Sequence, residues 1–157
     1  MRDEKGARAV PVDLAKAQPE SYRALVALTQ AAQAELERVG VDARLRELVA
    51  VRTSQINGCA YCLRAHTRDA VEAGETADRL AVLPAWWESQ YFSAQERAAL
   101  GLAERVARPS DPLRHRGHDE ALEGALDEAQ TAALTWFAIV MNSWNRMALA
   151  SGYAVRP

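Results

Sequence analysis

Cysteine is scarce in this chain of 157 residues, which holds only Cys59 and Cys62. A small secreted domain held together by disulfides carries more cysteines, spaced to close longer loops. No uninterrupted apolar stretch reaches the roughly 18–20 residues that a membrane-spanning helix needs. The first ten residues are charged and lack the apolar stretch of a signal peptide. These absences predict a cytoplasmic protein that does not enter a membrane.

A charge excess of either sign is absent too. Lys and Arg total 19, Asp and Glu total 21, and the net charge is -2, so the chain as a whole is not attracted to nucleic acid or to an anionic membrane. Ile and Phe occur only twice each, and the apolar share is mostly Ala, Leu and Val. Because Ala and Leu are strong helix formers, this composition favours an all-α fold.

Apolar residues recur at helical spacing along most of the chain. The pattern predicts a single all-α domain of about six to eight helices, over residues 20–39, 42–57, 59–73, 77–83, 93–107, 120–126 and 127–150. Residues 1–18 predict an extended N-terminal arm, which leaves 19–157 as the helical domain. Pro84 is expected to open an aromatic segment whose rings pack: Trp86, Trp87, Tyr91 and Phe92.

The helix expected over 127–150 is apolar around its full circumference between Ala132 and Met141. A helix of this kind must be buried. Burial against another subunit and burial in a well-covered core account for the pattern equally well. The sequence therefore leaves open whether this helix contributes to an oligomer.

The segment from Gly58 to His66 concentrates the reactive side chains. At about 100° per residue, Cys59, Cys62 and His66 fall on one narrow stripe of the expected helix. Cysteines three apart in a first helical turn can form a disulfide with little movement, and the positive helix N-terminus favours thiolate over thiol. His66 is placed to relay a proton. A thiolate, a second thiol and a base are the minimum set for peroxide reduction through a sulfenic acid and a disulfide.

Glu47 completes this set from the preceding helix, where it lies on the side away from Leu45 and Val49. If that side meets the cysteine stripe, the carboxylate orients His66 or takes the proton itself. A carboxylate in such surroundings must be paired or have a raised pKa, and a raised pKa is what a general base near neutral pH requires.

The array of Glu47, Cys59, Cys62 and His66, with spacings of 12, 3 and 4, resembles the core motif of the AhpD-like alkylhydroperoxidases. These proteins belong to the carboxymuconolactone decarboxylase superfamily. The segment 54–62, followed by His66-Thr67 and Asp69-Ala70, is similar to that core nearly position for position, and a looser likeness extends from 96–100 to 142–146. The resemblance therefore covers most of the chain beyond residue 20.

The resemblance implies an all-helical fold, homo-oligomers (trimers or hexamers) and reduction of small hydroperoxides without metal, flavin or another cofactor. An external thiol or lipoyl-type reductant would supply the electrons. Cys62 would attack the peroxide, Cys59 would donate a proton and act as the resolving thiol, and Glu47 and His66 would form the proton relay. The chain departs from the best-known peroxidases at Tyr61, where they carry a histidine. Superfamily members that decarboxylate lactones generally lack the cysteine pair, which argues against that activity.

Two other interpretations stay open. Glu47, Cys59, Cys62 and His66 could in principle supply the four ligands of a zinc ion. A non-catalytic oligomeric binding or redox-sensing protein could also keep the same fold and cysteine pair. His115 and His118 lie in an arginine-containing loop and are expected to be solvated.

Overall fold

The computed structural model describes residues 11–111 and 124–156, and within these ranges the chain is helical and has no strand. The elements are α1 (Leu14–Ala17), α2 (Pro19–Arg38), α3 (Ala43–Asn57), α4 (Ala60–Glu72), α5 (Ala77–Val82), the 3₁₀ helix η1 (Leu83–Glu88), α6 (Ala94–Ala107) and α7 (Glu128–Ala150). The all-α fold predicted from the sequence is confirmed. None of the described helices combines the length and the apolar character that crossing a membrane demands.

The helix starts follow the capping residues in the sequence. The Asp42 carboxylate accepts the N–H of the third residue of α3 at 2.8 Å. Capping boxes open α6, through Ser93 and Glu96, and α7, through Asp127 and Gln130. In a capping box each side chain satisfies a backbone N–H that the helix leaves without a partner. These local signals are why the boundaries of α3, α6 and α7 agree with the sequence prediction within one or two residues.

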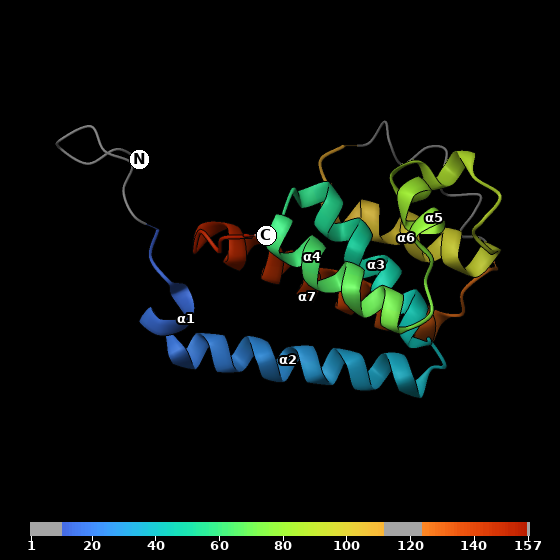
Figure 1. Cartoon of the computed structure of the whole chain (residues 1–157). Coiled ribbons are helices and arrows are strands. Elements are labelled where there is room, and N and C mark those ends of the chain that lie inside the picture. Colours follow the sequence, from blue (N-terminus) through green and yellow to red (C-terminus); the bar gives the residue numbers. More distant parts are fainter. Residues whose placement is uncertain (1–10, 112–123, 157) are drawn as a thin grey trace.

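Helix α3 is the centre of the domain and packs against α4, α6 and α7, whereas α2 runs along one edge beside α7 (Figure 1). The main core cluster lies where α2, α3, α6 and α7 meet and includes Leu36, Val49, Leu102, Leu134 and Phe137. A second cluster joins α3 and α6 to the aromatic segment and includes Leu48, Leu83, Trp86, Phe92 and Leu100.

A buried ion pair ties α3 to α6 within this core. The Glu104 carboxylate accepts from the Arg52 guanidinium at 2.5 and 2.8 Å and from the Trp86 indole at 3.0 Å. A buried charge pair of this kind requires that each group find hydrogen-bond partners. The contacts fix the rotation of α3, whose C-terminal end leads into the reactive segment.

Two local predictions need correction, and a third falls mostly outside the described residues. The arm is not fully extended, because Asp13 caps the short helix α1 at Leu14–Ala17. The segment that Pro84 opens begins as the 3₁₀ helix η1, and there Trp86 and Phe92 are buried whereas Trp87 and Tyr91 are exposed. The helix expected over 120–126 falls mostly outside the described residues, as do His115 and His118, and residues 124–126 form a turn.

Helix α7 is not buried all round in the single chain. Trp136 is 56% exposed and Ile139 is 39% exposed, on the side of the helix away from the core. Beside Trp136, an apolar groove of about 300 Å³ lies between α2 and α7. The side of α7 that faces the core is buried, as predicted. The opposite side leaves the apolar side chains of Trp136 and Ile139 exposed.

Candidate functional site

A tight connection between α3 and α4 builds the site. Gly58 has φ +66°, a left-handed conformation that side chains disfavour, and it ends α3. The N–H of Gly58 bonds to the Gln55 carbonyl at 3.3 Å, and the N–H of Cys59 bonds to the Ser54 carbonyl at 3.1 Å. The chain therefore reverses within two residues, and α4 packs back along α3.

Cys59 is the N-cap of α4 rather than its first residue, which shifts the predicted helix start by one position. Its Sγ accepts the backbone N–H of Cys62 at 3.3 Å, as a capping hydroxyl would. The two cysteines form a disulfide with a Cα–Cα distance of 5.4 Å, inside the normal range. Cys59 is 1% exposed and Cys62 is 6% exposed, so their reaction partners must enter the fold to reach them.

Glu47 and His66 meet across the α3–α4 contact. Glu47 Oε2 lies 2.9 Å from His66 Nδ1, and Glu47 Oε1 accepts from the Arg46 Nε at 2.9 Å. The carboxylate is buried and His66 is partly buried. The sequence prediction that these two side chains come together is confirmed by this contact.

The pKa of Glu47 is lowered, not raised. Burial alone would raise it, but the hydrogen bonds and charges of His66 and Arg46 outweigh burial. Of the two states that the sequence predicted for this carboxylate, paired or with a raised pKa, the structure shows the paired one, and the carboxylate is ionised at neutral pH. Because an ionised carboxylate only accepts hydrogen bonds, it holds the proton on His66 Nδ1 and leaves Nε2 free to exchange protons.

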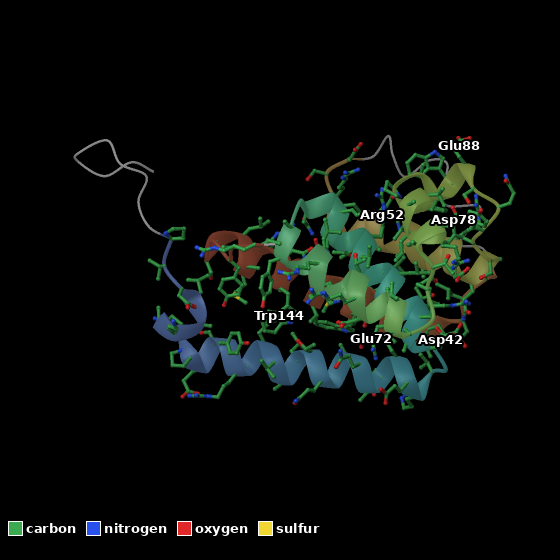
Figure 2. All side chains as sticks on the ribbon, viewed as in Figure 1. Asp42, Arg52, Glu72, Asp78, Glu88 and Trp144 are labelled. Atoms are coloured by element: carbon green, nitrogen blue, oxygen red, sulfur yellow. A yellow bond between two sulfur atoms is a disulfide. The ribbon has the colours of Figure 1, made fainter. Side chains whose placement is uncertain are left out.

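A cavity of about 230 Å³ opens beside these groups, between α2, α4 and α7; we call it the relay cavity. Cys62, His66 and Glu47 all line it. Trp144 projects from α7 toward α2 (Figure 2), where its indole N–H donates to Thr29 Oγ1 at 2.7 Å. The rest of the lining is mostly aromatic or thioether: Tyr22, Tyr61, Phe137, Met141, Met147 and Tyr153.

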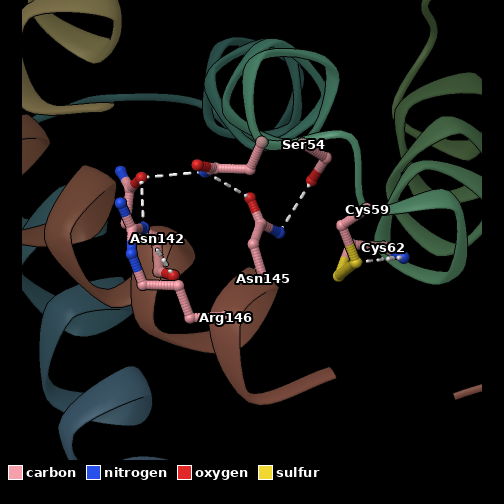
Figure 3. Close-up of a disulfide and its surroundings, with 7 residues drawn as sticks. Ser54, Cys59, Cys62, Asn142, Asn145 and Arg146 are labelled. Carbon is pink, nitrogen blue, oxygen red and sulfur yellow. Dashed lines mark hydrogen bonds between the residues drawn. A yellow bond between two sulfur atoms is a disulfide. The ribbon is translucent and has the colours of Figure 1, made fainter. Parts of the chain in front are cut away.

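A network of amides holds α7 against the end of α3 next to the disulfide (Figure 3). Asn57 Nδ2 donates to Asn142 Oδ1 at 2.8 Å and to Asn145 Oδ1 at 2.9 Å. The Asn145 amide donates in turn to Ser54 Oγ at 3.1 Å, and Arg146 donates to Asn142. Buried amides need such partners, and the network fixes α7, one wall of the relay cavity, against the end of α3.

The zinc site predicted as an alternative does not exist in the oxidised protein, because both sulfurs are joined to each other and neither is a thiolate. Asp69 lies one turn beyond His66, and no sequence motif marks it as a ligand. Its carboxylate, Glu47 and His66 can offer ligand atoms that all lie within 4.8 Å of one another. Among the residues that the structure describes, these three form the group that could hold a cation at the site.

Sequence reasoning also missed Tyr153 and the contribution of α2. Tyr153 lies beyond the end of α7 and packs against Cys59, Cys62 and Ala148. Thr29 and Gln33 of α2 line the relay cavity. No motif marks these residues. The apolar spacing of α2 predicts a helix, but it does not show which part of the fold that helix packs against.

The fold and the site together define an AhpD-like helical protein with a Cys-x-x-Cys disulfide beside a Glu–His pair. The model of the carboxymuconolactone decarboxylase family matches residues 19–105. This match covers more than half of the chain, and the chain belongs to that family.

Relatives and a solved structure agree with this placement. The chain is 39% identical over 117 residues to the uncharacterized protein YdfG of Bacillus subtilis, covering 71% of this chain and 76% of that one. It is 33% identical over 73 residues to the uncharacterized protein YnjA of Escherichia coli, covering 46% and 40%. A crystal structure from Agrobacterium tumefaciens matches with a TM-score of 0.83 and 27% identity, over 94% of this chain and 99% of that one. That protein is described as of unknown function, with a proposed role as the antioxidant defence protein AhpD.

Proposed function

We propose that the protein is a thiol-dependent hydroperoxide reductase. One observation carries the proposal: Cys62, half of a closed disulfide, lines the same cavity as the hydrogen-bonded Glu47–His66 pair. A redox-active sulfur, a partner sulfur in bonding position and an oriented base are the parts that the chemistry needs.

The reaction follows from these positions. In the reduced protein, His66 Nε2 takes the Cys62 thiol proton, and the thiolate attacks the terminal peroxide oxygen. The O–O bond breaks, Cys62 becomes a sulfenic acid, and the alkoxide leaves as an alcohol by taking the proton from His66. The Cys59 sulfur then attacks the Cys62 sulfur, water leaves, and the disulfide forms. Two electrons pass from the two thiols to the peroxide.

The lining of the relay cavity supports an organic hydroperoxide as substrate. Its aromatic and thioether side chains, among them Phe137, Met141 and Trp144, offer apolar surface to an alkyl or aryl group. The peroxide group of such a substrate would then lie beside Cys62 and the Glu47–His66 pair.

A turnover assay tests the proposal. Purified protein with dithiothreitol should consume cumene hydroperoxide catalytically, for many equivalents per chain, and produce the alcohol. A single equivalent consumed per chain would instead fit the non-catalytic redox-sensing alternative. Consumption no faster than with dithiothreitol alone would contradict the proposal.

We further propose that a second copy of this chain covers the apolar face formed by Leu28, Trp136 and Ile139, in a homo-oligomer. Exposed apolar surface of this kind marks association sites.

Trp136→Glu places a charge at the centre of the face and should shift the mass measured by light scattering from oligomer to monomer. The exposed Arg68→Glu variant on α4 is the matched control and should leave the mass unchanged. A wild-type monomer, or an unchanged mass for Trp136→Glu, would contradict this assembly.

A further inference from the structure

The disulfide faces two cavities, one for each sulfur. Cys62 lines the relay cavity, and Cys59 does not. Cys59 lines a smaller cavity of about 140 Å³ at the start of α4, which Cys62 does not line; we call it the cap cavity. Its walls are Gly58, Cys59, Ala60, Tyr61, Ala148, Leu149, Gly152 and Tyr153.

Two tyrosines lie where these cavities adjoin. Tyr61 and Tyr153 line both of them, and their rings meet edge to face with centroids 5.1 Å apart. Tyr61 comes from the first turn of α4, between the cysteines, and Tyr153 comes from the segment after α7. The two rings therefore belong to the lining of both cavities, and each cavity is lined by only one of the two cysteines.

We propose that the cap cavity is where a small alkyl dithiol attacks Cys59, while the peroxide reaches Cys62 through the relay cavity. This inference rests on the proposed function for the peroxide half of the cycle. Exchange requires the attacking sulfur to approach in line with the S–S bond, from the side opposite the leaving sulfur. Attack on Cys59 through the cavity that Cys59 lines and Cys62 does not would make Cys62 the leaving group.

Charge favours the same route. The relay cavity contains the ionised Glu47 carboxylate, which repels an incoming thiolate. The described residues that line the cap cavity include no carboxylate, and two of them, Cys59 and Ala60, are the N-cap and the first residue of α4. The partial positive charge of that helix end attracts an anion. An anionic reductant is therefore drawn to the Cys59 side.

The electron balance closes with the dithiol alone. One of its sulfurs, as thiolate, bonds to Cys59 Sγ, the S–S bond breaks, and Cys62 leaves as a thiolate in the relay cavity. The second dithiol sulfur then displaces Cys59 and closes the oxidised reductant. The dithiol loses two electrons and two protons, and the protein regains two thiols. This order regenerates the Cys62 thiolate in the relay cavity, which His66 also lines and where the peroxide reacts.

Two exposed alanines of α4 allow a crossed test, because Ala60 lines the cap cavity and Ala65 lines the relay cavity. Ala60→Trp should slow reduction of the disulfide by dithiothreitol about tenfold or more, measured by stopped flow, and leave oxidation of the reduced protein by cumene hydroperoxide unchanged. Ala65→Trp should slow oxidation of the reduced protein by cumene hydroperoxide and leave reduction of the disulfide by dithiothreitol unchanged. Val71→Trp, on an exposed position of α4 outside both cavities, is the control for an added indole and should change neither rate.

A trapping experiment identifies the attacked sulfur directly. Oxidised protein mixed briefly with β-mercaptoethanol and quenched in acid should carry the adduct on Cys59, located by peptide mass spectrometry. An adduct on Cys62, or a wild-type reduction rate in Ala60→Trp, would overturn the inference. Loss of the peroxide reaction with reduction through Cys59 intact would instead contradict the proposed function and leave the reductant site standing.

Discussion

Cys62→Ser is expected to lose peroxide turnover completely. A serine hydroxyl stays protonated near neutral pH and forms no sulfenic acid, so neither the attack on the peroxide nor the disulfide is available. The rate of cumene hydroperoxide consumption with dithiothreitol should fall about 10³-fold or more, to background. Cys62 packs in a small apolar cluster with Cys59 and Ala148, and serine is close to cysteine in size, so the circular dichroism spectrum should be retained.

Cys59→Ser is the matched variant, because it removes the other sulfur of the same disulfide. It retains the attacking thiol and should consume about one equivalent of peroxide per chain in a rapid first phase. The Cys62 sulfenic acid should then be detectable by dimedone labelling and mass spectrometry. Sustained turnover by Cys62→Ser, or the rapid phase appearing only in that variant, would contradict the assigned roles of the two cysteines.

Glu47→Gln should lower turnover about 100-fold or more, within the usual range for loss of general acid–base assistance. The amide keeps the size of the side chain but removes the charge that holds the proton on His66 Nδ1. The drop should appear in kcat for the peroxide step, and the thiol reductant step should change little. Glu72→Gln, an exposed carboxylate on α4, is the control and should retain wild-type turnover. A near-wild-type kcat in Glu47→Gln would contradict a role of the Glu47 carboxylate in the proton relay.

The same substitution changes how stability depends on acidity. The folded pKa of Glu47 lies below its ordinary value of 4.5, so the ionised carboxylate stabilises the folded state fully above that value. This stabilisation is lost as the pH falls through the lowered pKa. The difference in free energy of unfolding between wild type and Glu47→Gln, measured in urea, should therefore shrink as the pH drops below about 4.5. A difference that grows in acid would contradict the direction of the shift.

Much of this fold could be predicted because its signals are local. Asp42, Ser93 and Asp127 each cap a helix through a backbone N–H three residues later, which a sequence shows directly. Glu47 and His66 could be paired in advance because Gly58 forces a reversal between two helices of known period. Their spacing then places both side chains on the facing sides.

What the sequence did not reveal depends on contacts between distant segments or on one side-chain rotamer. Thr29 and Trp144 meet across 115 positions, and no periodicity encodes that meeting. The second partner of Glu47, Arg46, could not be predicted either, because adjacent helical residues do not normally face each other. The long arginine side chain nevertheless turns back to the carboxylate at 2.9 Å.

The position of Cys59 at the cap of α4 links chemistry to backbone order. The sulfur that accepts the Cys62 N–H is also a member of the disulfide. Reduction of that bond therefore changes the group that caps the first turn of α4 from a disulfide sulfur to a thiol. In the proposed cycle, the order of this first turn would then follow the redox state of the cysteine pair.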